Sequence, residues 1–541
     1  MADFPWLTAL IVAPAFGALA LWLIRPLRSV ARPLALAWSG IVLACGIAAT
    51  VAFQSADGAI RLTEYASWIP RFGISYAVGV GGLGLLMILL VSLLVPLVLL
   101  AGWREQTTPA RQAHYAALVL ATQSLVVTVF AARDIALFYI AFEAMLIPVY
   151  FLIGSFGGER RRAAALKFLI YSLAGGLAML AGLVGLWAAG PGGPTAFMID
   201  HAAGVPLSQT AERLIFLSFF VAFAVKAPLF PVHTWLPDAA QAAKPGTSVL
   251  LVGVLDKAGT FGMVALCLPL FPRAAEWAAP GIAVLAVISI LWGAALALAQ
   301  KDIMRMIAYT SVSHFGFIVL GIFAFNQTAE VGSAFYMINH GLATGALFLL
   351  AGMLIQRRGT AQIDQMGPGL QRTTPVLAGL FLVVGLAVLS LPGMSTFVSE
   401  FMVIVGAFQA NPAAAIVGAT GVILAALYIL MAYQKIFTGP PRADLSDTPD
   451  LAGRELWAVG PLVALLLVLG FYPGPALETL SEGAAAAVSA VTSPTTAVEV
   501  VGEGAIEIEP IGEGEPAIEG EPPGEGEPAG VPAGSEEGSQ P

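Results

Sequence analysis

The chain has 541 residues, of which 58% are hydrophobic and 11% are charged, and its mean hydropathy is +0.85. Soluble domains carry roughly 25% charged residues, so this composition excludes a soluble globular enzyme. It also excludes a nucleic-acid-binding protein, which needs a clustered basic surface, and a disulfide scaffold, because the only cysteines are Cys45 and Cys267. We therefore expect a membrane protein.

The formal net charge of −9 hides an uneven distribution of charge along the chain. All 25 basic residues lie at or before Arg454, whereas the 15 charged residues beyond it are all acidic. Residues 506–530 are rich in Gly, Pro and Glu and have little apolar surface to bury, so we expect the tail from residue 476 onward to be disordered and exposed. Binding of a basic partner or of cations is a second interpretation, although like-charged runs are usually just solvated.

Apolar stretches recur along the whole body of the chain. A spanning helix needs about 20 mostly apolar residues, and we predict fourteen. They centre on residues 4–24, 33–53, 77–100, 113–131, 134–154, 165–189, 211–231, 246–268, 280–299, 303–325, 332–355, 375–407, 413–437 and 455–472. No basic residue precedes the first stretch, so we expect a retained helix and not a signal peptide.

The loops between these stretches differ in their content of Lys and Arg. Counted over alternate loops, one side of the membrane holds 18 of these residues and the other holds five, namely Arg61, Arg71, Arg133, Arg213 and Arg273. Cytoplasmic loops carry the excess of positive charge. We therefore predict that both termini, including the acidic tail, lie outside the cytoplasm.

We single out six ionisable residues that lie well inside apolar stretches, at mid-bilayer depth, where a charge costs about 2.5–3.5 kcal/mol on insertion scales. They are Glu143, Lys226, Lys257, His314, His340 and Glu400. A buried ion pair between Glu143 and Lys226 that only fixes helix packing is one interpretation. Six such groups on six helices exceed what packing needs, and a buried pair is weak evidence of stability. We therefore favour a proton pathway, in which the two histidines connect Lys257 with Glu400.

Prolines interrupt two of the predicted helices. Pro228 and Pro231 follow Lys226 in the seventh helix, and Pro392 precedes Glu400 in the twelfth. Interruptions of this kind at membrane depth occur in protein interiors or beside water. Their separation by five helices predicts an all-α membrane protein with two inverted five-helix repeats, helices 4–8 and 9–13. The predicted divisions are residues 1–110 (three helices), 111–270 (first repeat), 271–440 (second repeat), 441–475 (last helix) and 476–541 (tail).

One apparent cofactor motif is rejected. The segment GVGGLG at residues 79–84 matches the dinucleotide fingerprint, but we expect no strand before it and no βαβ unit around it, so it should only open a membrane helix. The cysteines lie far apart, and no His/Cys/Glu cluster has metal-ligand spacing. We expect neither a metal nor a redox cofactor on this chain.

Several segments, taken in order, resemble a known family. They are FYIAFEAMLIPVYFLIG, VKAPLFPVHTWLPDA, LDKAGTFG, ALAQKDIMRMIAYTSVSHFGF, NHGLATGALFLLAG and LPGMSTFVSEF. Together they resemble the antiporter-like membrane subunits of respiratory complex I, the proton-pumping NADH:quinone oxidoreductase, over roughly residues 75–440. The chain M branch is the most similar, because the twelfth helix carries Glu400 where the sister chains L and N usually carry a lysine.

The resemblance implies a role for each of the six residues. Glu143 and Lys226 would form a control pair, and Lys257 would be the central proton carrier. The two histidines would lie on a hydrated axis, and Glu400 would end the half-channel. The sequence departs from the family pattern at Ala240, where a histidine is usual, and at Gly81, where an aspartate is common.

These expectations define a function and its rivals. When a neighbouring subunit pulls Glu143 away, Lys226 would lose its counter-charge and pass its proton or its field to Lys257. NADH oxidation and quinone reduction would occur on partner subunits that carry FMN and iron–sulfur clusters, in a bacterial plasma membrane. The alternatives are a subunit of a multisubunit Na⁺/H⁺ antiporter, a membrane-bound hydrogenase subunit, and a structural spacer.

Overall fold

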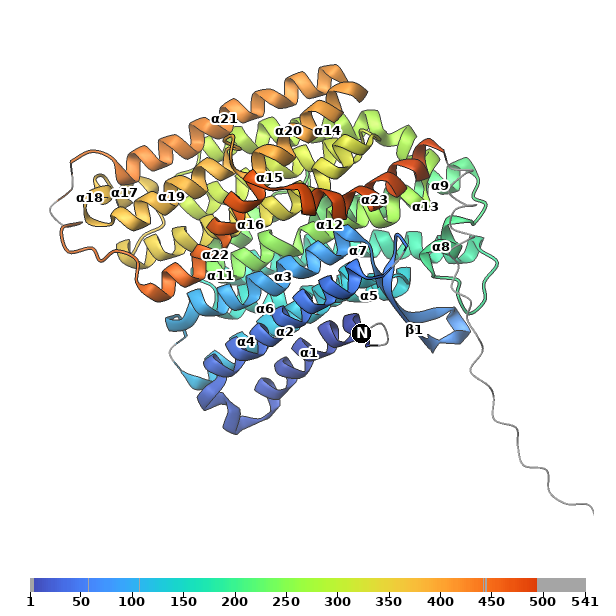
Figure 1. Cartoon of the computed structure of the whole chain (residues 1–541), viewed down its shortest axis with the longest axis horizontal. Coiled ribbons are helices and arrows are strands. Elements are labelled where there is room, and N and C mark those ends of the chain that lie inside the picture. Colours follow the sequence, from blue (N-terminus) through green and yellow to red (C-terminus); the bar gives the residue numbers. More distant parts are fainter. Residues whose placement is uncertain (1–3, 57, 107, 441, 443–444, 494–541) are drawn as a thin grey trace, which may run out of the picture.

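A computed structural model shows the chain as a bundle of long helices that lie roughly side by side (Figure 1). It describes residues 4–56, 58–106, 108–440, 442 and 445–493. Within these residues, 12 helices are long and apolar enough to cross a membrane, and two further apolar helices are shorter. The predicted helical, multi-pass membrane protein is confirmed. The count of fourteen spans and the two repeats stay predictions.

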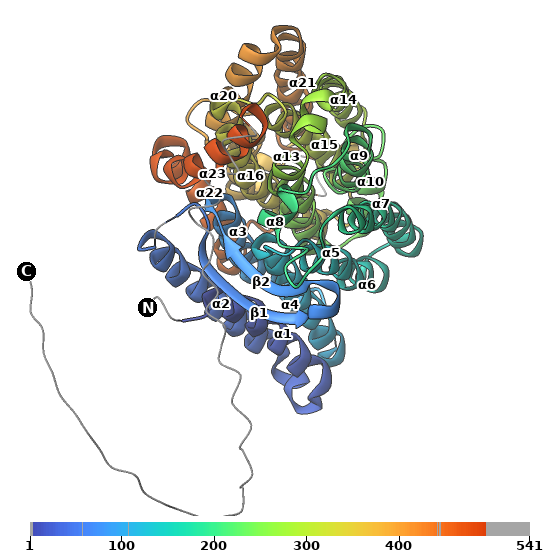
Figure 2. The same cartoon turned by 90° about the vertical axis from the view of Figure 1, so that its right-hand side faces the viewer.

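The N-terminal part contains the described strands. Its elements are α1 (Trp6–Leu23), the 3₁₀ turn η1 (Arg25–Val30), α2 (Ala31–Gln54), β1 (Arg61–Ile69), η2 (Pro70–Phe72), β2 (Ile74–Val80), α3 (Gly82–Ala101), η3 (Gly102–Arg104) and α4 (Pro109–Ala131). The strands pair antiparallel, with Tyr65 opposite Ala77, and Gly73 at the turn has a φ of +75°. We call the end of the bundle with this hairpin the hairpin end (Figure 2).

The hairpin corrects one expectation about the segment GVGGLG. The expectation that no strand precedes this segment was wrong, because β2 runs through Gly79 to Val80. Residues 61–80 mix β-branched and aromatic residues with Arg61 and Glu64, so they favour strands and are too polar to span. The segment still opens a membrane helix, α3, and the strand before it pairs antiparallel, unlike the strands of a βαβ unit.

The next helices include the first interruption. They are α5 (Ile135–Ala144), α6 (Leu146–Phe156), α7 (Arg161–Ala189), α8 (Ile199–Ala203), α9 (Gln209–Lys226) and α10 (Trp235–Ala242). Helix α9 ends at Lys226, and the helix resumes only at Trp235, beyond Pro228 and Pro231. The predicted interruption is therefore present, as expected for two residues that cannot donate a backbone hydrogen bond.

The central helices contain two irregular turns and, among the described spanning helices, the two that are most buried. They are α11 (Pro245–Leu250), the π-helical turn η4 (Leu251–Leu255), α12 (Lys257–Gly262), the π-helical turn η5 (Met263–Cys267), α13 (Leu268–Leu270), α14 (Pro272–Leu298), α15 (Ile303–Ile322) and α16 (Gln327–Arg358). Successive long helices run in opposite directions between the two ends of the bundle, so α16 begins at the hairpin end. It lies near the middle of the bundle (Figure 2).

The last helices contain the second interruption. They are α17 (Ile363–Met366), α18 (Leu370–Thr373), α19 (Pro375–Val388), α20 (Ser395–Ala410), α21 (Pro412–Phe437), α22 (Gly453–Phe471) and α23 (Gly474–Thr492). The chain between α19 and α20 contains Pro392 and Gly393, which has a φ of +96°. The interruption predicted for the twelfth stretch is therefore present.

Helix α23 corrects the prediction of a disordered tail from residue 476. Its buried residues Leu480, Ala484, Ala487 and Val491 recur at helical spacing, so the segment has an apolar face to bury. The ion pair between Arg61 and Glu482, at 3.0 Å, also ties it to the hairpin. The acidic run beyond residue 493 lies outside the described residues, so the disorder expected for it remains a prediction.

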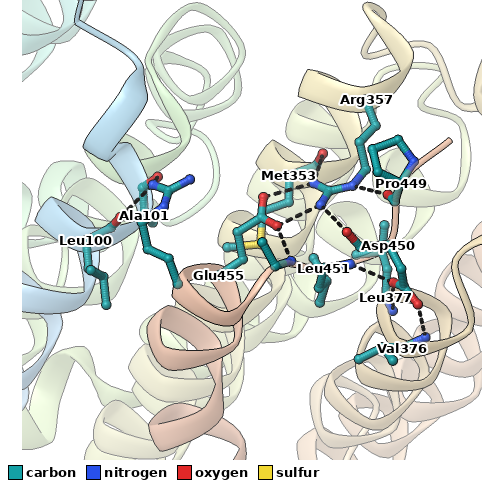
Figure 3. A network of polar contacts seen from close by, with 12 residues as sticks. Leu100, Ala101, Met353, Arg357, Val376, Leu377, Pro449, Asp450, Leu451 and Glu455 are labelled. Carbon is teal, nitrogen blue, oxygen red and sulfur yellow. Dashed lines mark hydrogen bonds and ion pairs between the residues drawn. The ribbon is translucent and has the colours of Figure 1, made fainter.

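A network of polar contacts fixes α16 at the end opposite the hairpin (Figure 3). Arg357 donates to both carboxylate oxygens of Glu455 on α22, at 3.0 and 2.7 Å, and to the carbonyl of Asp450. The carboxylate of Asp450 accepts from the backbone N–H groups of Val376 and Leu377 at the start of α19. The Arg357–Glu455 pair is bidentate and largely buried, and together with the bonds to Asp450 it holds three helices in register.

Candidate functional site

Glu143 lies near the end of α5, and its carboxylate packs directly against α7. The residue is partly buried, and Oε1 has no hydrogen-bond partner among the described residues. A Cβ atom on Gly176 of α7 would lie 2.0 Å from Oε1 and 2.3 Å from Cδ. Gly176 therefore provides the space that the carboxylate occupies. Met145, two residues further on, separates α5 from α6 and so interrupts this helix beside the carboxylate.

Lys226 is fully buried at the end of α9. Its Nζ lies 4.9 Å from the ring centroid of Phe142 and 5.7 Å from that of Phe168, within the range of a cation–π contact. Phe142 is the neighbour of Glu143 in the chain, so Lys226 lies beside the part of α5 that carries the carboxylate. No ion-pair contact between Glu143 and Lys226 is present in the described part of the chain, and Lys226 Nζ has no hydrogen-bond partner there. The structure thus places the expected control pair together but unbonded.

Helix α12, which begins with Lys257, packs closely on the last turns of α9. A Cβ atom on Gly259 would lie 2.5 Å from the carbonyl oxygen of Phe223, and one on Gly262 would lie 2.4 Å from the Phe223 ring. Small residues at these positions let the two backbones approach each other. Lys226 and Lys257 therefore lie on helical segments in direct contact.

Lys257 lies between the π-helical turns η4 and η5, and all of its polar neighbours are buried. Its Nζ lies 2.7 Å from Nδ1 of His340 on α16 and 3.2 Å from Oδ1 of Asp256, and it donates to the carbonyl of Val252 in η4. π-Helical turns often occur at functional sites. Here the turn supplies a backbone acceptor five residues before the lysine, while Asp256 supplies a counter-charge.

The contacts continue from His340 to Glu400. The ring centroids of His340 and His314 on α15 lie 5.2 Å apart, and those of His314 and Tyr336 lie 5.8 Å apart. The Tyr336 hydroxyl donates to Oε2 of Glu400 at 2.8 Å. The structure therefore brings Lys257, the two histidines and Glu400 into one buried series of contacts, which we call the central axis: Lys257, His340, His314, Tyr336 and Glu400.

The interrupted helix contributes directly to the environment of Glu400. Ser390, between α19 and α20, has a φ of +58°, a left-handed conformation that non-glycine residues rarely adopt. In this conformation its hydroxyl donates to Oε2 of Glu400. The break thus gives the carboxylate a second donor in addition to Tyr336, which explains how a carboxyl group is accommodated at this depth.

The sequence analysis missed four polar residues of this region. Asp256 and Glu330 are ionisable and fully buried. Asp256 lies inside the predicted stretch 246–268 and so meets the criterion that selected the six residues, whereas Glu330 lies two residues before the stretch 332–355. Asp256 stands beside Lys257 in the segment LDKAGTFG, and Glu330 lies three residues into α16. Tyr336 and Ser390 carry no signal in the sequence, because their importance depends on their contacts with Glu400.

The axis has the residue types for proton transfer. Lysine, histidine, tyrosine and carboxyl groups can each take up or release a proton, and adjacent members lie in contact. Within the described residues, no group of three His, Cys, Asp or Glu side chains could hold a metal ion. At the two positions that depart from the family pattern, Ala240 is buried in α10 and Gly81 caps α3, so neither supplies a titratable side chain.

A bundle of spanning helices with two interruptions beside a buried axis of ionisable residues defines an antiporter-like membrane protein. Comparison with known proteins agrees. The family described as NADH:quinone oxidoreductase/Mrp antiporter, TM, matches residues 132–427. NADH-quinone oxidoreductase subunit M of Mycobacterium tuberculosis strain H37Rv is 44% identical over 521 residues, covering 89% of this chain and 93% of that protein.

Solved structures give the same result. A chain in the structure of respiratory complex I from Thermus thermophilus with bound NADH has a TM-score of 0.82 and 33% identity, covering 90% of this chain and 99% of that chain. A chain of the Mrp complex from Dietzia sp. DQ12-45-1b has a TM-score of 0.79 and 23% identity, covering 92% and 98%, which is a likeness of fold alone. The chain therefore belongs to the NADH:quinone oxidoreductase/Mrp antiporter membrane family, among the NADH-quinone oxidoreductase subunit M proteins.

Proposed function

We propose that this chain is a proton-translocating membrane subunit of a respiratory NADH:quinone oxidoreductase. The observation that carries the proposal is the central axis, in which five proton-carrying side chains on four separate helices follow one another in contact. The 44% identity to a protein named NADH-quinone oxidoreductase subunit M supports the assignment to this complex. NADH oxidation and quinone reduction would take place on partner subunits, which would carry FMN and iron–sulfur clusters.

The proposed cycle begins at Glu143 and Lys226, which lie together without an ion pair. A charge change in a neighbouring subunit would move the Glu143 carboxylate toward or away from Lys226. Burial and the absence of a counter-charge both disfavour a charged lysine, so losing the carboxylate would favour release of the Lys226 proton. The proton, or the change in field, would pass to Lys257 across the contact between α9 and α12.

Lys257 would then exchange its proton along the axis. The ammonium group donates to Nδ1 of His340, so transfer breaks the N–H bond at Lys257 and forms one at the imidazole. Asp256 would balance the charge of the site while Lys257 is protonated. His314 and Tyr336 lead on to Glu400. Moving one proton against 100 mV requires about 2.3 kcal/mol, which the redox reaction on the partner subunits would supply.

The topology in the membrane is also part of this proposal. The excess of Lys and Arg lies in the loops opposite the hairpin end, which the positive-inside rule assigns to the cytoplasm. The hairpin, the start of α16 and both termini would then face outward from a bacterial plasma membrane.

The second candidate is a subunit of a multisubunit Na⁺/H⁺ antiporter, which the likeness of fold to the Mrp complex favours. The two candidates differ in their partners and in the ion that is moved. Purification of the chain with flavin- and iron–sulfur-containing partners, and transport driven by NADH, would favour the oxidoreductase. Transport driven by a Na⁺ gradient without NADH would favour the antiporter.

The direct test uses membrane vesicles that contain the whole complex with Lys257→Ala. NADH-driven quinone reduction and proton translocation are followed together, and assembly is checked by the recovery of the chain in the complex. We expect both rates to collapse in the assembled variant. Lys301→Ala, at an exposed lysine between α14 and α15, is the matched control and should behave as the wild type. Wild-type rates with Lys257→Ala would contradict the proposal and favour a structural spacer.

A further inference from the structure

Glu330 is a buried carboxylate that the central axis does not use. It lies in the first turn of α16, only 1% exposed, and neither of its carboxylate oxygens has a hydrogen-bond partner among the described residues. A carboxylate taken out of water without a partner is strongly disfavoured. The side chain must therefore be protonated or be reached by water. In the first state it can release a proton, and in the second it can exchange one with water.

Glu330 belongs to a row of such groups along one face of α16. Ser333, His340 and Thr344 follow it at spacings of three, seven and four residues, which places all four on the same face of the helix. All are buried, and Ser333 Oγ, His340 Nε2 and Thr344 Oγ1 also lack partners in the described part of the chain. Most buried polar atoms in proteins are paired, so these four groups on one face each still need a hydrogen-bond partner, which water molecules could supply.

The position of the row connects the central axis with the hairpin end. His340, a member of the axis, lies ten residues from Glu330, which is about 15 Å along a helix. Ser333 lies between them, and its hydroxyl packs against Gly321 of α15, where a Cβ atom would be only 2.1 Å away. Glu330 itself is three residues from the start of α16 and so lies close to the surface at that end.

We propose that Glu330 is a proton-carrying residue between the histidines of the central axis and the hairpin-end surface. This inference rests on the proposed function. A proton leaves the imidazole of His340 through water molecules along the row, and an O–H bond forms at the Glu330 carboxylate. That bond then breaks as the proton passes to water at the hairpin end. No electron moves, and the carboxylate returns to its initial state.

A structural role for the same residue makes a different prediction. An ionised carboxylate in the first turn of a helix interacts favourably with the helix dipole, by about 0.3–1 kcal/mol at exposed sites. A residue with only this role affects folding and assembly. It does not affect how many protons cross the membrane for each NADH oxidised.

The test uses the complete complex in liposomes with Glu330→Gln, Glu330→Asp and the control Glu276→Gln. Glu276 is an exposed glutamate near the start of α14, at the same end of the bundle. We expect Glu330→Gln to assemble and to translocate protons at least tenfold more slowly. We expect Glu330→Asp to recover most of the rate, because it keeps the carboxyl group, and Glu276→Gln to match the wild type.

The outcomes separate this inference from the proposed function. Wild-type translocation with Glu330→Gln, while Lys257→Ala abolishes it, would overturn the role of Glu330 and leave the proposed function standing. Equal loss in Glu330→Gln and Glu330→Asp, together with reduced assembly, would also overturn it in favour of the structural role. Undiminished translocation in the Lys257→Ala complex would reject the proposed function itself.

Discussion

A methyl group at position 176 should displace the Glu143 carboxylate. In the structure a Cβ atom on Gly176 would lie 2.0 Å from Oε1, 2.3 Å from Cδ and 2.7 Å from Oε2, whereas real Cβ contacts below 3.0 Å essentially do not occur. The carboxylate of a Gly176→Ala variant must therefore move by at least about 1 Å. A misplacement of about 1 Å in a reacting geometry can reduce a rate by about 100-fold, or about 2.7 kcal/mol.

The assay is NADH-driven proton translocation by the assembled complex in vesicles. Gly185→Ala is the control, because it lies on the same helix and its Cβ would make only ordinary contacts, the nearest 3.6 Å from Ile215. Both substitutions favour helix formation by about 1 kcal/mol, so they differ in the clash alone. We expect a loss of translocation in Gly176→Ala only. Wild-type translocation by assembled Gly176→Ala would refute the reasoning that the position of Glu143 controls the cycle.

The remaining predictions concern Lys257 and Glu400. Lys257→Met leaves Asp256 buried without its partner, so we expect a destabilisation of about 3–5 kcal/mol. The measurement is the temperature midpoint at which the chain is lost from the complex, which should fall. Asp256→Asn combined with Lys257→Met should restore that midpoint. An unchanged midpoint in the single variant would mean that the pair is not coupled. Ser390→Ala removes one of the two donors to Glu400 among the described residues. Such a bond is worth about 1.5–3 kcal/mol, so we expect turnover to fall by about 10- to 150-fold without loss of assembly. Unaltered turnover would show that Tyr336 suffices.

The sequence allowed the prediction of features that depend on the local chemistry of the chain. A spanning helix must be apolar over its whole length, so the long helices and the charges inside them could be recognised directly. Pro228 and Pro392 marked the two interruptions, because proline cannot donate the backbone hydrogen bond of an interior helical position. Proline alone does not decide the matter, since Pro96 and Pro280 lie inside continuous helices. Asp256 satisfied the same rule as Lys257, and Glu330 lies just before the predicted stretch 332–355. They could have been found by counting every charge within or at the start of an apolar stretch.

Features that depend on tertiary contacts could not be predicted. Nothing in the sequence indicates that Tyr336 donates to Glu400, or that the left-handed backbone at Ser390 turns its hydroxyl toward the same carboxylate. The space that Gly176 leaves for Glu143 depends on how α5 packs against α7. Helix α23 was missed because its alanine-rich face is only weakly apolar. The segment is ordered by the contacts that this face makes with the bundle, and these contacts cannot be read from the sequence.

The central claim is that protons cross the membrane through Lys257 and the axis that follows it. The most direct measurement follows NADH oxidation and proton translocation together, in liposomes that contain the complex with both Asp256→Asn and Lys257→Met. This pair of substitutions removes both charges, so that assembly is preserved while the carrier is lost. Our account predicts an assembled complex in which NADH oxidation and proton translocation both collapse. Wild-type rates of both would contradict it.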